Sequence, residues 1–412
     1  MPAMSWLDVE FVRDLFFKEK YTIDGAVAYL QFHYPEQNGI SARNLRRFLK
    51  ENGISIQQRL STAELEDNVR VVTDEFAGVL GRKKMQAALR LRGIKAGQDR
   101  IRLAQAKVAP AYQERRRQGT ERRLNPQSYR ALHFGYNLHV DQNETLVQYG
   151  IVFVIAVDGK SSFIVHAAIM PRKNNIAIYE LMYVPAVSKY GLWDQVIADG
   201  GREFYLVHHI QEYLTTLRIK DDGELSDRPP YRQVTSMQNN RVERLWQEVN
   251  EMVGYPLKAA YIALGNAGII DLANDVHKFT CSYIGCILAK FLMQRCMDIW
   301  NHHNIPKKGI PADFVDDRRN YAIPDDALPS TDAAVRMYVE VGQLTEETSF
   351  GVDPLAGQPE KQLERNNAFW LGMDVMLGGV QSISESVLHE YYGPLQQAFN
   401  RFIEMSMEML TN

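Results

Sequence analysis

The chain has 412 residues, 45% of them hydrophobic, and a formal net charge of −3. This length exceeds one typical domain and the hydrophobic content is enough for sizeable cores, so we expect two or three folded domains. The near-neutral charge excludes nucleic-acid binding driven by overall charge alone. The sequence shows neither a signal peptide nor an apolar run of about 18 residues, so we expect an intracellular protein with no membrane partner.

Residues 1–60 predict an all-helical region with a helix-turn-helix pattern. A helix is expected at 24–32, the segment PEQNG breaks it, and Ser41 is a suitable N-cap for a second helix that ends before Gly53. Such a helix can enter a DNA major groove, although helical hairpins of this size are also common without DNA. Its broad basic face carries Arg43, Arg46, Arg47 and Lys50.

Residues 61–130 predict a second, basic helical region. Between residues 81 and 130 there are fifteen Lys and Arg against three acidic residues. This surplus suits salt-sensitive contacts with DNA phosphates, and a solvated basic linker would have the same composition. Helices are expected at 82–92, before Gly93, and at 98–107. The expected DNA contacts are Arg82, Lys83, Lys84, Arg100, Arg102, Arg115, Arg116 and Arg117.

Residues 131–318 predict an α/β domain. Apolar runs rich in β-branched side chains indicate strands at 136–142, 150–157, 161–169 and 195–198. Asp158 and Gly159 predict a hairpin turn after the second strand, so we interpret Asp158 as structural.

Helices are expected in the same domain at 174–189, where Pro185 should kink or end the helix, and at 202–217. Residues 218–238 contain Gly and two prolines and predict an exposed loop. A further helix begins near Asn239, and its buried stripe at helical spacing is Val242, Leu245, Trp246 and Val249.

Three acidic residues stand where these elements can bring them together. Asp141 ends the first strand, Asp199 follows the fourth, and Glu243 lies at the edge of the apolar stripe. Carboxylates are preferred ligands of Mg²⁺ and Mn²⁺, and two such ions about 3.5–4 Å apart drive phosphodiester chemistry by activating the attacking oxygen and neutralising the leaving one. Any one of these acids alone would be read as a cap or a solvated residue; together they predict a metal-dependent site.

The sequence around these acids resembles the core of retroviral-type integrases and DDE transposases. DGGREF at 199–204 is similar to the Asp-x-Gly-x-Glu-Phe of retroelement integrases, and NNRVERLW at 239–246 resembles the form found in eukaryotic, transposon-derived members. LRGI at 91–94 and WNHHNIP at 300–306 resemble stretches that flank the core in that branch, so the resemblance covers about residues 40–315. The 43 residues between Asp199 and Glu243 match the longer insertion of the same branch.

The resemblance implies an α/β RNase H-like catalytic core, with a mixed five-stranded sheet flanked by helices, a helix-turn-helix-like N-terminal region and a helical C-terminal region. It implies that Asp141, Asp199 and Glu243 are catalytic and hold two Mg²⁺ or Mn²⁺ ions, with no small-molecule cofactor. The implied activity is hydrolysis at DNA ends and strand transfer, by a homo-oligomer on double-stranded DNA in the nucleus. Arg241 and Arg244 flank the Glu and are expected to hold phosphates.

Gln142, Gly200 and Gln238 depart from the family pattern without removing a carboxylate. Two alternatives stay open. The first is a catalytically silent DNA-binding regulator or scaffold, and the second is an RNase H-like nuclease that cuts without joining. Glu203 also has two interpretations, a hydrogen bond near the metal site or a cap on the helix that follows Asp199.

Cysteine and histidine usage excludes a zinc domain at the front of the chain, because residues 1–130 hold one His, His33, and no Cys. The three thiols, Cys281, Cys286 and Cys296, favour a reducing compartment. His302 and His303 are interpreted as packing or capping groups. Residues 319–412 predict a linker, PDDALPSTDAA, and a helical tail at 360–410 that either packs on the core or mediates assembly.

Overall fold

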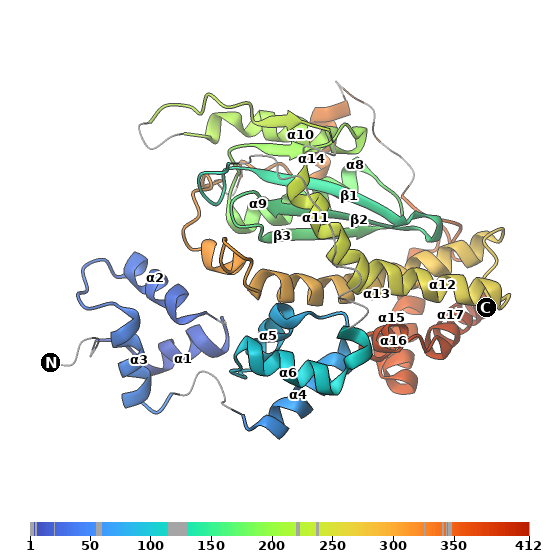
Figure 1. The fold of residues 1–412 in the computed structure, drawn as a ribbon. Coiled ribbons are helices and arrows are strands. Elements are labelled where there is room, and N and C mark those ends of the chain that lie inside the picture. The colour runs from blue at the N-terminus through green and yellow to red at the C-terminus, as the bar shows by residue number, and fades with distance from the viewer. Residues whose placement is uncertain are drawn as a thin grey trace. The chain divides into compact units, whose positions relative to one another are not determined.

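The structure is a computed structural model in which two compact units are described (Figure 1). Unit 1 comprises Met1–Gln127 with Ile299–Arg318, and unit 2 comprises Ser128–Asp298 with Arg319–Asn412. The described residues are 4, 6–19, 21–54, 60–113, 130–219, 223–235, 239–324, 326–339, 342, 344 and 348–411, with the side chain of Asn240 left aside. Arg115, Arg116, Arg117 and Gln238 therefore lie outside the described residues.

The first half of unit 1 is a three-helix cluster. It contains α1 (Val9–Phe17), α2 (Ile23–His33) and α3 (Ala42–Glu51), packed around a core that includes Leu30 and Leu45. The side chain of Ser41 accepts a hydrogen bond from the Asn44 amide, as its predicted N-cap role requires. Both helices predicted between residues 24 and 53 are confirmed.

The second half of unit 1 is another three-helix cluster, made of α4 (Thr62–Glu75), α5 (Arg82–Leu91) and α6 (Gln98–Val108). The residue at which α5 was expected to stop, Gly93, has a φ of +76°, which a glycine adopts without strain. The returning segment Ile299–Arg318, with the 3₁₀ turn η7 (Pro311–Phe314), joins both clusters. Its Asp313 and Asp316 accept hydrogen bonds from Thr22 and Tyr21, and its His302 carbonyl accepts one from Arg90.

Unit 2 is built on a mixed five-stranded sheet with the strand order β3-β2-β1-β4-β5. The first three strands pair antiparallel, whereas β4 is parallel to both β1 and β5. Every residue of β2 is buried, which explains its unbroken apolar run. The strands are β1 (Leu138–Leu146), β2 (Ile151–Asp158), β3 (Ile164–Met170), β4 (Val196–Ala198) and β5 (Tyr231–Gln233). The predicted mixed five-stranded sheet is confirmed.

Helices flank this sheet. A nearly continuous helical run of α8 (Asn175–Ile178), the π-helix η2 (Tyr179–Tyr183) and α9 (Val184–Tyr190) packs beside β3, and α10 (Tyr205–Tyr213) packs on β5. α11 (Asn240–Val249) crosses β1 and β2 (Figure 1). It continues through the π-helix η6 (Asn250–Gly254) into α12 (Tyr255–Asn266). The 28-residue α13 (Asp275–His302) follows and carries the three buried cysteines.

The structure corrects two expectations for this domain and decides one outcome of a third. The first strand runs to Leu146 instead of ending at Asp141, because it keeps pairing with β2 beyond that residue. The expected exposed loop at 218–238 contains β5, and its Arg218 is only 1% exposed. Pro185 does not end its helix: it lies in the first turn of α9, directly after the π-helix, and the helical run continues to Tyr190.

The C-terminal region is helical, as predicted, although α14 (Thr331–Val339) begins inside the expected linker. It also contains α15 (Pro359–Leu377), α16 (Gly379–Leu388) and α17 (Gly393–Thr411). A buried ion pair between Arg365 and Asp353 joins α15 to the segment before it, and Phe402 of α17 stacks under the guanidinium of Arg365. Among the described residues, none of the helices combines the length and the apolar character that crossing a bilayer requires.

Asp158, at the end of β2, organises the hairpin as predicted. Its carboxylate is fully buried and accepts hydrogen bonds from the amides of Gly135, Lys160 and Ser161, at 2.9, 3.0 and 2.9 Å. It also accepts bonds from the Ser161 hydroxyl and the Trp193 indole, at 2.8 and 3.2 Å. Asp158 thus ties the hairpin to the segments that precede β1 and β4.

We predict that Asp158→Asn lowers the thermal unfolding midpoint of unit 2, at a cost of about 2–5 kcal/mol. The amide nitrogen would face hydrogen-bond donors, and each buried group left unsatisfied costs about 1–3 kcal/mol. Calorimetry of the full chain measures the effect, with exposed Asp332→Asn as the control. Equal midpoints for the two variants would contradict the structural role of Asp158.

Candidate active site

Asp141 lies on β1, and Asp199 directly follows β4, the parallel strand beside it. The register of β1 and β4 pairs Leu138 with Val196 and His139 with Ile197. Continued for two residues, this register puts Asp199 level with Asp141, on strands about 4.8 Å apart. Residues at the same level of parallel strands point to the same side of the sheet. The fold therefore brings the first two predicted carboxylates together.

The helix that carries Glu243 is attached to β1 at two points. Just before α11, the side-chain amide of Asn239 donates to the Val140 carbonyl at 3.0 Å and bonds the His139 ring through its oxygen at 2.7 Å. Three residues after Glu243, the Trp246 indole donates to the Asp141 carboxylate at 2.8 Å. Glu243 lies between these attachments, so the two bonds determine where it sits relative to β1.

Packing supports these polar attachments. The stripe expected on α11 is buried, with Val242 and Val249 fully inaccessible and Trp246 only 6% exposed. Asn239 is fully buried as well. A buried polar side chain that meets its partners on both sides defines one orientation of the helix, because any other orientation leaves those groups unsatisfied.

The three carboxyl groups influence one another electrostatically. Burial raises the pKa of Asp141 to about 7; the charges of Glu243 and Asp199 add to the rise, while hydrogen bonds from Trp246 and the Gln142 backbone oppose it. Burial, and then the charge of Asp199, raises the pKa of Glu243. Like charges act in this way only within electrostatic range of one another, so Asp141 lies within that range of both Glu243 and Asp199. We call these three acids the carboxylate cluster.

The chemistry of this donor set fits a hard divalent cation. All three side chains offer carboxylate oxygens, and a nearby cation would relieve their mutual repulsion. Within the described ranges no group of three or more His, Cys, Asp or Glu side chains forms a ready metal-holding cluster. One oxygen of Asp141 is engaged by Trp246, and the residue is 5% exposed.

The DGGREF loop, which begins at Asp199, carries a fourth carboxylate, Glu203. The Gly201 amide donates to Asp199 at 3.1 Å, and a Cβ at position 201 would lie 2.6 Å from a Glu203 carboxylate oxygen. With any larger residue at 201, the Glu203 carboxylate would have to shift from this position. Glu203 lies within the 3₁₀ turn η3 (Arg202–Phe204), is 8% exposed and provides no cap bond, which disfavours the capping interpretation.

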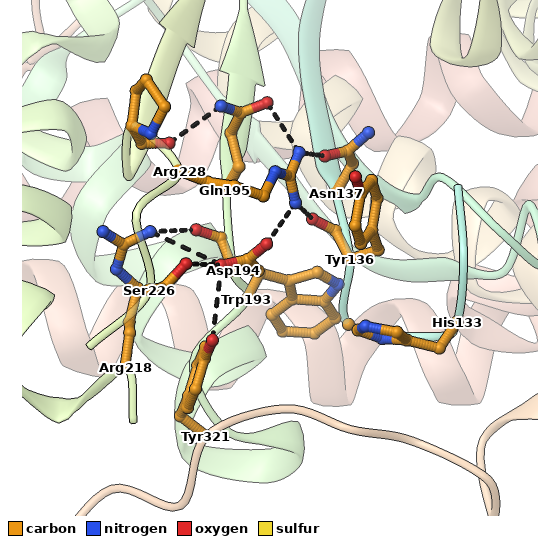
Figure 2. A network of polar contacts seen from close by, with 12 residues as sticks. His133, Tyr136, Asn137, Trp193, Asp194, Gln195, Arg218, Ser226, Arg228 and Tyr321 are labelled. Atoms are coloured by element: carbon orange, nitrogen blue, oxygen red, sulfur yellow. Dashed lines mark hydrogen bonds and ion pairs between the residues drawn. The ribbon is translucent and has the colours of Figure 1, made fainter. Parts of the chain in front are cut away.

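A separate polar network holds the opposite ends of β1 and β4, as Figure 2 shows. Arg228 bonds Asp194, Gln195 and Asn137, and its guanidinium lies 3.7 Å from the centre of the Tyr136 ring. Arg218 donates to the Asp194 carbonyl at 2.5 Å. The network anchors the described part of the long Asp199–Glu243 insertion at the edge of the sheet away from the acids.

The predicted DNA-binding residues are mostly accessible in the structure. On α3 all four basic residues are exposed, and so are Arg82, Arg102 and Arg244. Lys83, Arg100 and Arg241 are half-buried, and the guanidinium of Arg100 donates to the Leu60 carbonyl. Lys84 differs from these: it is 8% exposed and its ammonium lies over the Trp300 ring.

Comparison with protein-family models matches residues 133–311 to the integrase core domain. This segment is an integrase core domain. The match spans less than half of the chain and includes all three acids of the cluster. A search of curated proteins found none that matches the chain. The mixed sheet and its flanking helices are the RNase H-like fold of an integrase core, with all-helical regions before and after it.

Some functional features of the integrase core could not be predicted from the sequence. Asn239 was predicted to begin the helix and Trp246 to lie in its buried stripe, but their bonds to β1 follow only from the fold. Lys173 and Glu144, which lie close to Glu203, were missed entirely, since they come from two distant segments and match no motif. An integrase core indicates an integrase-like, nucleic-acid-processing function for this chain.

We predict that Asn239→Ala loosens the start of α11, because the Val140 carbonyl and the His139 ring lose a buried partner. Hydrogen exchange at the amides of residues 242–244 should accelerate about 5- to 150-fold, which corresponds to a local loss of about 1–3 kcal/mol. Arg244→Ala, an exposed change on the same helix, is the control. Unchanged protection in Asn239→Ala would show that packing alone holds α11.

Proposed function

We propose that this protein is a DNA integrase or transposase-like enzyme, derived from a eukaryotic transposon, that cuts and joins DNA with divalent metal ions. The observation that carries the proposal is the attachment of α11 to β1 on both sides of Glu243, which supports a shared site with Asp141 and Asp199. Acids on β1, directly after β4 and on α11 of an integrase core support phosphoryl transfer as the chemistry of this site.

In this proposal Asp141, Asp199 and Glu243 hold two Mg²⁺ or Mn²⁺ ions. When bound, the ions would make an attacking water or 3′-hydroxyl nucleophilic and neutralise the leaving oxygen. The protein's own part is to fix the carboxylates. β1 and β4 set two of them at one level, Trp246 orients Asp141, and Asn239 holds the helix of Glu243. Arg244, exposed one residue after Glu243, is available to a DNA phosphate.

Unit 1 supplies the DNA-binding surface in this proposal. The exposed basic face of α3 follows a helix and a turn, and a helix of this kind presents Arg and Lys to phosphates or base edges. Joining two DNA ends requires two active sites, so we propose that the enzyme acts as a homo-oligomer on DNA in the nucleus.

A second candidate is a DNA-binding regulator that has kept the fold without catalysis. The observation that favours it is the Trp246 bond, which engages one oxygen of Asp141 while burial raises the pKa of that carboxyl group to about 7. Both features weaken a metal ligand. The second candidate binds DNA and cuts none.

We predict that Asp199→Asn lowers the rate of metal-dependent DNA cutting and joining at least about 100-fold, because a lost metal ligand removes several kcal/mol of transition-state stabilisation. Labelled duplex DNA incubated with purified protein in Mg²⁺ or Mn²⁺ separates shorter cleavage products from longer joined ones. Glu212→Gln, an exposed change on α10, is the matched control.

Full strand transfer by Asp199→Asn would overturn the catalytic role of the cluster. Cutting without joining in the wild type would favour a nuclease. Wild-type DNA binding with neither product, in both metals, would favour the regulator.

A further inference from the structure

Lys173 bridges the two acidic motifs of the integrase core. It lies just after β3, and its ammonium is 2.9 Å from a Glu144 oxygen and 3.7 Å from a Glu203 oxygen. Glu144 is three residues beyond Asp141 on β1, and Glu203 is four residues beyond Asp199. One cation thus spans the segments that follow the first two acids of the cluster.

The bridge leaves one of its oxygens unsatisfied. The Glu203 side chain is only 9% exposed, and its oxygen nearest Lys173 is buried and makes no hydrogen bond. Lys173 itself is half exposed, as is Glu144 at 40%. The buried, unbonded oxygen of Glu203 attracts the exposed Lys173 ammonium and keeps its positive charge at this position. Because an ammonium has three N–H donors, not all of them are used here.

The Lys173 ammonium can exchange a carboxylate partner for a phosphate. Exposed Lys–Glu pairs contribute little stability, typically about 0–1 kcal/mol, so the Glu144 bond is easily exchanged. A DNA strand reaching Asp141 and Asp199 brings phosphates, whose negative charge replaces that of Glu144. The buried Glu203, whose carboxylate lies over Gly201, stays behind and keeps the lysine oriented.

We propose that Lys173 binds a phosphate of the DNA strand that enters the carboxylate cluster, with Glu203 as its positioning residue and Glu144 as the partner that the phosphate displaces. This inference rests on the proposed function, because it requires DNA at the cluster. It adds a sequence-independent contact from a segment, residues 171–174, that no acidic motif includes.

The test is the salt dependence of DNA binding by the full chain. A fluorescent, blunt-ended DNA duplex is titrated in Ca²⁺, which takes the same oxygen ligands as Mg²⁺, between about 50 and 200 mM salt. Losing one phosphate contact lowers the slope of log K against log salt by about 0.9. Lys173→Gln should show this smaller slope and weaker binding at low salt, while Lys173→Arg keeps the wild-type slope.

Glu144→Gln gives a result of opposite sign. Without Glu144 the lysine is free before DNA arrives, so this variant should bind DNA more tightly than the wild type at low salt. A merely structural ion pair would instead make both variants weaker. Lys189→Gln, an exposed change on α9, is the control and should match the wild type.

A wild-type slope in Lys173→Gln, or weaker binding in Glu144→Gln, would overturn the role of Lys173. Neither result would contradict the proposed function, because the DNA cutting and joining assay tests that function separately. A wild-type chain that binds no DNA would overturn both.

Discussion

The bond between Trp246 and Asp141 is the interaction on which the candidate active site depends. It joins a helix to the strand that carries the first acid, and it does so three residues from the third acid. Asn239 repeats the attachment on the other side of Glu243. Because both groups are buried, sliding or rotating α11 would leave polar atoms without partners at both points, so the position of Glu243 follows from these two bonds.

The two ends of the parallel strands have different tasks. At one end, the network of Arg228, Arg218 and Asp194 is closely bonded and holds the insertion that precedes α11 (Figure 2). At the other end, burial and neighbouring acidic charges raise the pKa values of Asp141 and Glu243. A closely bonded network at one end and acids that repel one another at the other is an arrangement that suits a cation-binding site carried on a stable sheet.

Much of this arrangement follows from the sequence. The strands of the hairpin, the structural role of Asp158 and the buried stripe of α11 were predicted from apolar patterning and turn residues. The family resemblance supplied the three acids and the RNase H-like core. β5 was missed because it is a three-residue strand in a segment with two prolines just before it, and so short a strand has no periodicity to detect.

Contacts between distant segments could not be predicted in the same way. The Lys173 bridge joins β1, the end of β3 and the DGGREF loop, and no spacing in the sequence connects them. The burial of Lys84 depends on Trp300, more than 200 positions away. Local sequence patterns specify helices and strands. The partner of an exposed charged side chain is determined only when these elements pack together.

The measurement that tests the central claim most directly is Mn²⁺ binding by the metal-free chain, followed through the electron paramagnetic resonance signal of free Mn²⁺. If Asp141, Asp199 and Glu243 form a metal site, the wild type removes free Mn²⁺ from solution and Asp141→Asn and Glu243→Gln each bind it much more weakly. Equal binding by the wild type and both variants, or none by the wild type in the presence of DNA, would contradict the account.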